Sequence, residues 1–185
     1  WGIPEEQAAR WLTAAIEVGT VGWPDPVRGR IPVSVSVPAV DPMRARQIVA
    51  ESGCQSAAVR VNGSPADDAV RLEAVRDALG PSGAIRAVAH GGWDVDAATS
   101  AVTALDRAAG GLEFVVQPCA TLGEIALLRR RIDVPVAVEQ ALRAAQDPLA
   151  RDLAGSADIV VLRVGAMGGV RRAMRVADES GLPGV

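Results

Sequence analysis

The sequence predicts an α/β fold in which a parallel sheet, covered by helices, curls toward a (β/α)8 barrel. Along the chain the spacing of apolar residues switches repeatedly between two, which is typical of strands, and 3.6, which is typical of helices. Six strand–helix pairs follow one another at roughly 25-residue intervals, as parallel strands with helical crossovers require. Since eight such pairs close a barrel, this chain is expected to supply six of them and to lack two.

The elements are assigned in chain order. The first helix is expected over residues 5–19, within a helical lead-in of residues 1–22, and the partial barrel domain is expected over residues 23–185. A strand over residues 31–40 leads to a helix over residues 41–53, which has Asp41 as its cap, Pro42 at its first position and Gly53 at its end. The other strands are predicted at residues 56–62, 84–91, 112–118, 134–140 and 159–165. The other helices are predicted at residues 66–80, 95–111, 121–131, 147–155 and 168–181.

Composition and charge exclude several classes of function. The chain has 22 acidic residues against 19 basic ones, all arginine, and a net charge of -3 argues against a nucleic-acid surface. Cys54 and Cys119 lie far apart without CxxC spacing, which indicates neither a zinc site nor a disulfide framework. No apolar run is long enough to span a membrane, and no leader precedes the first amphipathic segment. We therefore expect a cytoplasmic protein with neither nucleic acid nor membrane as a partner.

The carboxyl ends of the strands are where barrels of this type place their functional residues. Those positions hold Arg60, Asn62, His90, Gln117, Glu139, Gln140 and Arg163. Because side chains two apart on a strand share a face, Ala58 should point into the barrel with Arg60. Val88 should point inward with His90 for the same reason. The second and sixth strands lie opposite each other in an eight-stranded barrel, so Arg60 and Arg163 should face each other across the pocket.

These side chains point to anion binding and proton transfer. Arg60 and Arg163 could bind a carboxylate through two parallel hydrogen bonds, or stabilise an oxyanion or enolate without a metal. His90, the only histidine, has an ordinary pKa that suits general acid–base catalysis near neutrality. Glu139 could orient the histidine, pair with an arginine or act as a base if desolvated. The same charges could instead form an ion-pair network that plugs the barrel, because buried charges need partners.

Seven short segments carry a resemblance to a known family. They are GWPDPVR (22–28), VRLEAVRDALGP (70–81), GWDVD (92–96), VQPCAT (116–121), RRRIDVPVAVEQALR (129–143), DIVVLRVGAMGGVR (158–171) and GLP (181–183). In this order and at this spacing they resemble the actinobacterial o-succinylbenzoate synthases, which are dehydratases of menaquinone biosynthesis in the enolase superfamily. The resemblance implies an enolase-superfamily TIM-type barrel whose capping domain is mostly absent from this chain.

The resemblance also implies a metal site that the residues here do not supply. The family's three metal-binding acids match Val88, Val116 and Glu139, of which only the last is an acid. Hard divalent ions need several oxygen ligands, and one carboxylate with waters holds Mg²⁺ weakly. We therefore expect no metal and no other cofactor.

The family's catalytic lysines are replaced as well. Its Lys-x-Lys pair on the second strand matches Ala58 and Arg60, and its lysine on the sixth strand matches Arg163. The family's asparagine near the first metal ligand matches His90, and the glutamate after the third ligand matches Gln140. A guanidinium stays protonated and only donates hydrogen bonds, so the proton abstraction implied by the resemblance cannot run here unchanged.

From these observations we predict a metal-independent lyase or cyclase, repurposed in bacterial secondary metabolism, that acts on an anionic or carbonyl-bearing small molecule. The candidate catalytic residues are His90, Arg163, Arg60 and Glu139. The candidate substrate-binding residues are Gln117, Gln140, Asn62, Val88, Val116 and Ala58. Two alternatives stay open: a non-catalytic relative that binds a ligand or partner, and an o-succinylbenzoate synthase with altered ligands. The open edges of a six-stranded sheet also predict further chain or a partner that closes it, which includes a homo-oligomer.

Overall fold

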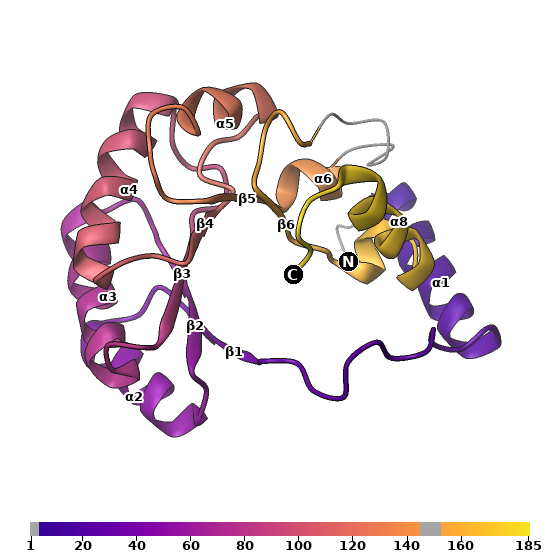
Figure 1. Ribbon diagram of the computed structural model, residues 1–185, viewed down its shortest axis with the longest axis horizontal. Helices are drawn as coiled ribbons and strands as arrows, with labels where there is room; N and C mark the ends of the chain where they lie inside the picture. The colour runs from indigo at the N-terminus through magenta and orange to yellow at the C-terminus, as the bar shows by residue number, and fades with distance from the viewer. Residues whose placement is uncertain (1–3, 145–152) are drawn as a thin grey trace.

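The structure, a computed structural model, describes residues 4–144 and 153–185. Its centre is one sheet of six parallel strands in the order β1-β2-β3-β4-β5-β6 (Figure 1). The strands are β1 (Ser34–Val37), β2 (Ser56–Arg60), β3 (Ala84–Val88), β4 (Phe114–Val116), β5 (Val136–Val138) and β6 (Ile159–Val160). Each strand pairs in parallel with the next strand in the sequence. Every connection therefore returns the chain to the same end of the sheet before the next strand begins. The predicted α/β fold, six strands of a parallel barrel, is confirmed.

Four helices form an arc outside the strands β1 to β4 and toward β5 (Figure 1). They are α2 (Pro42–Ser52), α3 (Pro65–Leu79), α4 (Val95–Ala109) and α5 (Leu122–Leu128). The predicted ends of α2 are confirmed: the side chain of Asp41 accepts a hydrogen bond from the backbone N–H of Arg44 at 3.0 Å, and Gly53 has a φ of 67°. Glycine adopts this left-handed conformation without steric cost, which explains why the helix stops there.

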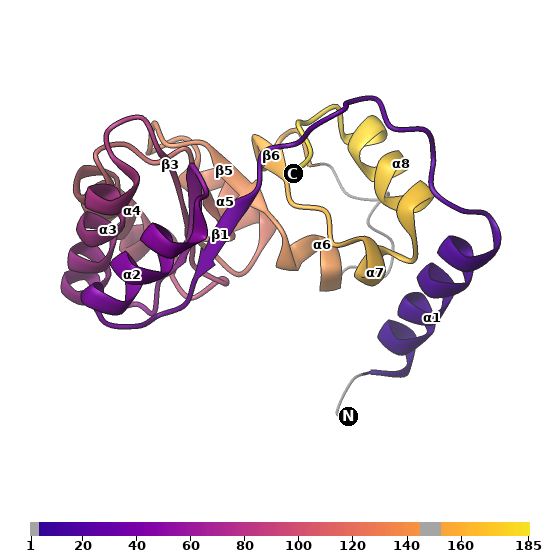
Figure 2. The ribbon, with the colours of Figure 1, turned by 90° about the horizontal axis from the view of Figure 1, so that it is seen from below.

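The remaining helices lie on the β6 side of the sheet (Figure 2). They are α1 (Glu5–Thr20), α6 (Gln140–Ala144), α7 (Val164–Met167) and α8 (Val170–Ser180). Helix α1 packs against α7 and α8, and the segment of residues 21–33 then carries the chain across to β1 (Figure 1). The division into a lead-in of residues 1–22 and a barrel domain of residues 23–185 stays a prediction. Within the described ranges, no helix is long and apolar enough to cross a membrane.

The carboxyl-terminal third differs from the prediction in detail. The strand predicted over residues 159–165 ends at Val160, because residues 164–167 form α7 and the left-handed Gly168 and Gly169 lead into α8. The short helix α6 was not predicted, and most of the polar helix predicted at residues 147–155 lies outside the described residues. Gly184 pairs with Val160 of β6 in parallel: the N–H of Val160 donates to the carbonyl of Pro183, and the N–H of Val185 donates to the carbonyl of Val160, each at 2.9 Å. An isolated parallel bridge thus joins this segment to β6.

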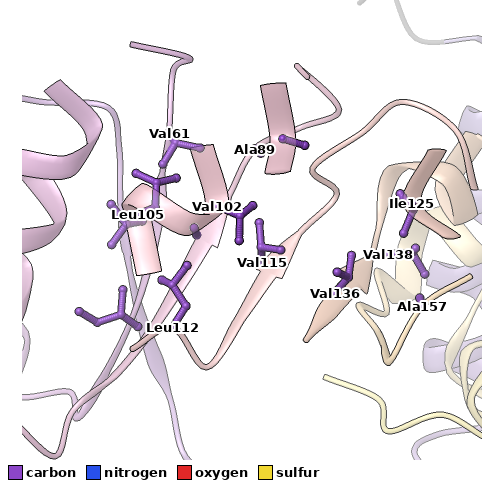
Figure 3. Close-up of a cluster of buried hydrophobic side chains, with 14 of the residues drawn as sticks. Val61, Ala89, Val102, Leu105, Leu112, Val115, Ile125, Val136, Val138 and Ala157 are labelled. Carbon is purple, nitrogen blue, oxygen red and sulfur yellow. The ribbon is translucent and has the colours of Figure 1, made fainter. Parts of the chain in front are cut away.

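The main hydrophobic core lies between the outer face of the sheet and the covering helices. Val115 of β4 lies beside Val102 of α4 (Figure 3), and these two side chains are 0% exposed. The inner face carries a smaller cluster built on Phe114, Val116 and Ala137. The outer face thus provides most of the apolar burial, and the inner face is left to form a pocket.

Candidate functional site

The inner face of the sheet borders a cavity of about 380 Å³. It is lined by Ser36, Val37, Pro38, Ala58, Arg60, Arg86, Val88, His90, Phe114, Val116, Glu139, Val161, Arg163 and Val185. Seven of these were predicted from the sequence, namely Ala58, Arg60, Val88, His90, Val116, Glu139 and Arg163. The cavity collects side chains from β1 to β4 and from the segments that follow β1, β3, β5 and β6, which is the end of the sheet where the sequence placed the functional residues.

Two arginines reach the cavity from opposite sides. Arg60 is the last residue of β2, and Arg163 directly precedes α7. The Arg60 side chain makes no hydrogen bond or ion pair with any residue in the described part of the chain, although its backbone carbonyl accepts from Arg71 Nη1 at 3.3 Å. Arg163 instead donates from Nε to Glu139 Oε1 at 2.7 Å. One cation is thus unpaired at the cavity wall, and the other is anchored.

Glu139 is the acid of this anchor. It follows β5 directly, and its side chain is only 4% exposed. A carboxylate buried to this degree needs a charged or hydrogen-bonding partner, and Arg163 supplies it. Of the three roles that the sequence left open for Glu139, the structure shows the pairing with an arginine.

His90 lies after β3 in a left-handed conformation with a φ of 55°. Asparagine and histidine tolerate this conformation better than most residues. Burial, and then the positive charge of Arg60, lower the pKa of His90 below its ordinary value of 6.5. Arg143 and Arg163 act in the same direction, and Glu139 opposes them. The imidazole is therefore mainly neutral at neutral pH.

The amide of Gln140 sets the hydrogen-bonding state of this imidazole. Its Nε2 lies 3.3 Å from His90 Nδ1. When the amide donates, the neutral ring carries its proton on Nε2 and presents a donor there. When the amide oxygen faces Nδ1 instead, that nitrogen carries the proton and Nε2 becomes a base. Gln140 thus contacts the histidine and does not line the cavity.

Two other predicted residues lie away from the cavity wall. Gln117 is 1% exposed, and its amide is hydrogen-bonded to the backbone of Cys119, Glu139 and Ala141. Asn62 is exposed and its Oδ1 accepts from the backbone N–H of Ser64 at 3.1 Å. Both follow the last residue of a strand, where the chain turns and alternation no longer decides where a side chain points. Their contact with a substrate, like that of Gln140, stays a prediction.

Seven residues that line the cavity were not predicted from the sequence, and two of them, Arg86 and Phe114, are in contact with each other. Arg86 and Phe114 occupy neighbouring inner positions of β3 and β4, and the Arg86 guanidinium lies 4.8 Å from the centre of the Phe114 ring. Arg86 also donates from Nε to Glu113 Oε2 at 2.6 Å. The sequence could have identified Arg86, because it lies two residues before Val88 on the same strand and its side chain should therefore point inward as well. A third guanidinium therefore faces the cavity.

The residues present do not fit the divalent metal that the family resemblance implies. Val88 and Val116 offer only methyl groups, and Glu139 is engaged by Arg163. In residues 4–144 and 153–185, no group of three or more His, Cys, Asp and Glu side chains could hold a metal ion. A hard cation needs several oxygen ligands, and this wall offers one carboxylate that is already paired.

Comparison with known proteins gives a family and named relatives. A family model described as enolase C-terminal domain-like matches residues 42–180. The o-succinylbenzoate synthase of Thermobifida fusca (strain YX) is 51% identical over 180 residues, which are 96% of this chain and 56% of that protein. The o-succinylbenzoate synthase of Mycobacterium ulcerans (strain Agy99) is 46% identical over 182 residues, which are 96% of this chain and 54% of that protein. The chain thus spans about half the length of these curated relatives.

Solved structures support the fold. A mandelate racemase/muconate lactonizing family protein from Azoarcus sp. EbN1 matches with a TM-score of 0.75 and 23% identity, over 87% of this chain and 44% of that one. An isomerase from Streptomyces coelicolor A3(2) matches with a TM-score of 0.76 and 18% identity, over 96% of this chain and 57% of that one. At these identities the likeness concerns the architecture alone.

Proposed function

We propose, on the premise that the chain belongs to the enolase C-terminal domain-like family, that its pocket binds a small carbonyl-bearing carboxylate and transfers a proton without a metal. The observation that carries this proposal is the Arg60 guanidinium, which faces the cavity without a partner in the described part of the chain. Arg86 and Arg163 line the same cavity, where Glu139 is the only acid among the described lining residues. A pocket with this charge balance favours an anion.

The guanidinium groups are suited to carboxylates and enolates. Arg60 can present two parallel N–H groups to a carboxylate. Arg163 is held through Nε by Glu139, which leaves its two Nη groups for an oxygen that gains negative charge. Valine side chains and Phe114 line the rest of the wall, and their apolar surface strengthens such electrostatic contacts by excluding water.

His90 supplies the proton transfer. Removing a proton from the carbon next to a carbonyl group yields an enolate, which is the step shared by many eliminations and cyclisations. The neutral imidazole can take that proton on Nε2 in one tautomer and donate to the carbonyl oxygen in the other. Arg60 and Arg163 would stabilise the enolate oxygen, so that no Lewis acid is needed.

The name of the curated relatives suggests a probe. o-Succinylbenzoate carries two carboxylates and a ketone with an adjacent CH₂ group, so it combines both features that the pocket favours. We do not extend the synthase reaction itself to this chain, because the lysines that the family resemblance implies are replaced by Ala58, Arg60 and Arg163. The proposed reaction class is a lyase or cyclase that uses arginine and histidine in their place.

The test is hydrogen exchange of o-succinylbenzoate in D₂O with EDTA present. The parent protein should exchange the CH₂ protons next to the ketone for deuterium, as measured by proton NMR, and His90→Ala should not. Arg46→Ala removes one exposed charge outside the cavity and should exchange like the parent. If the parent binds the probe but catalyses no exchange, the enzymatic proposal is wrong.

A non-catalytic ligand-binding relative is the second candidate. The ion pair of Arg163 with Glu139 favours it, since two of the four candidate catalytic residues are engaged with each other. In that case the cavity would hold an anion at Arg60 without chemistry. The exchange experiment separates the two candidates, because binding without exchange is the outcome that the second one predicts.

A further inference from the structure

Gln117 has a conformation and a burial that the proposed chemistry does not explain. Together with His90 it is one of two non-glycine residues with positive φ in the described part of the chain, at 46° for Gln117. Its side chain is polar, yet the residue is only 1% exposed and does not line the cavity. A left-handed non-glycine residue costs free energy and persists where surrounding contacts hold it.

The contacts of Gln117 join the loops that carry the site. Its Oε1 accepts from the backbone N–H of Glu139 at 3.0 Å and from that of Ala141 at 3.2 Å. Its Nε2 donates to the carbonyl of Cys119 at 2.9 Å, which fixes the amide orientation. One side chain thus satisfies two backbone donors at the start of α6, directly beside the carboxylate of Glu139 and the amide of Gln140.

The backbone of Gln117 holds the loop of His90 in the same way. Its carbonyl accepts from the N–H of Gly91 at 2.6 Å. The two loops lie so close that a Cβ at Gly91 would come within 3.2 Å of Ala120 Cα, and Gly91 itself has a φ of 73°. The position of His90 therefore depends on the position of the loop that begins at Gln117.

We propose that Gln117 is the positioning residue of this site, which sets His90 and Glu139 relative to each other through these backbone hydrogen bonds. The inference rests on the proposed function, because it gives those two residues their roles. This role differs from the direct substrate contact that the sequence suggested for Gln117. A displacement of the two loops by about 1 Å would move the imidazole and the ion pair out of register.

The experiment uses the fact that His90 is the only histidine, so its Hε1 proton gives a signal that no other residue duplicates. Gln117→Met keeps the side-chain length and removes both amide functions. The backbone bond to Gly91 remains in this variant, so its effect reaches His90 through the start of α6, where Gln140 contacts the imidazole. We expect the His90 signal to move and its pKa to rise toward 6.5, because the imidazole becomes less buried and lies farther from Arg60. The amides of Glu139 and Ala141 should exchange faster, and o-succinylbenzoate should bind about tenfold more weakly.

Asp158→Ala is the matched control. Asp158 Oδ2 accepts from the N–H of Val136 at 2.9 Å, at the amino end of β5 and away from the cavity. This variant loses that backbone contact and the ion pair of Asp158 with Arg129, both away from the cavity, so it should lower stability without moving the His90 signal. If Gln117→Met moves that signal no more than Asp158→Ala does, Gln117 is merely structural and the proposal is wrong.

Gln117→Glu keeps the test valid if the methionine variant does not fold. One oxygen of the new carboxyl group can still accept from Glu139 and Ala141, and burial beside the Cys119 carbonyl favours a proton on the other oxygen, which then donates in place of Nε2. Both amides should therefore remain protected, and their loss of protection in a folded variant would overturn the proposal. If the parent binds no o-succinylbenzoate, the proposed function fails, but the His90 signal and the amide exchange still decide the positioning role.

Discussion

The two faces of the sheet differ in burial and in chemistry, and β3 shows the difference within one strand. Ile85 and Ala87 point outward and are 0% exposed. Arg86 and Val88 point inward, border the cavity and are only partly buried. Alternation thus assigns stability to one face and ligand contact to the other. A substitution on the outer face should mainly lower the free energy of unfolding. A substitution on the inner face should mainly change the affinity for a ligand.

The largest expected difference between the two faces is the loss of unfolding free energy in Ile85→Ala compared with that in Val88→Ala. Deleting the Ile85 side chain from the filled outer layer should lower the free energy of unfolding by about 2–5 kcal/mol. Val88→Ala should cost about 1 kcal/mol or less, because its side chain already borders a cavity. Urea denaturation of the two variants measures both values. Equal losses would show that the inner face is as tightly packed as the outer one.

Arg60→Ala probes the inner face without touching the core. It should weaken o-succinylbenzoate binding by about 2–4 kcal/mol, roughly 30- to 900-fold, the scale of losing a charge-assisted donor at a preorganised site. Arg60→Lys should restore little, because lysine lacks the planar pair of donors. Calorimetry measures the affinities, with Arg46→Ala as the control for charge. Unchanged affinity with a melting temperature lowered by several degrees would make Arg60 a structural plug.

Arg163→Ala should affect both properties, because it leaves the buried carboxylate of Glu139 without its partner. Since the Arg163 side chain is 59% exposed, we expect a loss of only about 1–2 kcal/mol of stability. Adding Glu139→Gln should recover most of it, because the uncompensated charge is removed. A double-mutant cycle on the unfolding free energies tests this, and purely additive losses would argue against the pair.

His90 should make stability depend on pH in one direction. Its pKa is lowered on folding, so the unfolded chain binds a proton more readily in the window just below pH 6.5. Stability should therefore rise with pH through that window and level off above it. The difference between the parent and His90→Ala in denaturation across that pH range isolates this contribution. A difference that falls as pH rises would mean that the folded imidazole has a raised pKa.

The order of the elements and the inward series of residues followed from the sequence, because both depend on periods that persist over several residues. The placement of Gln117 did not, since its side chain follows a left-handed turn that no alternation describes. Helices α6 and α7 have only five and four residues, too few to show a helical period. The pairing of Glu139 with Arg163 depends on the distance between two strand ends, so the sequence could only name it among other roles.

The most direct test of the central claim, that arginines serve this pocket in place of a metal, is a calorimetric titration of o-succinylbenzoate. It is done once with EDTA and once with Mg²⁺ or Mn²⁺ in excess. The account predicts the same affinity in both titrations, and no tight site when either ion is titrated alone, because Val88 and Val116 offer no oxygen and Glu139 is held by Arg163. Binding that appears only with the divalent ion, and is lost in Glu139→Gln, would contradict it.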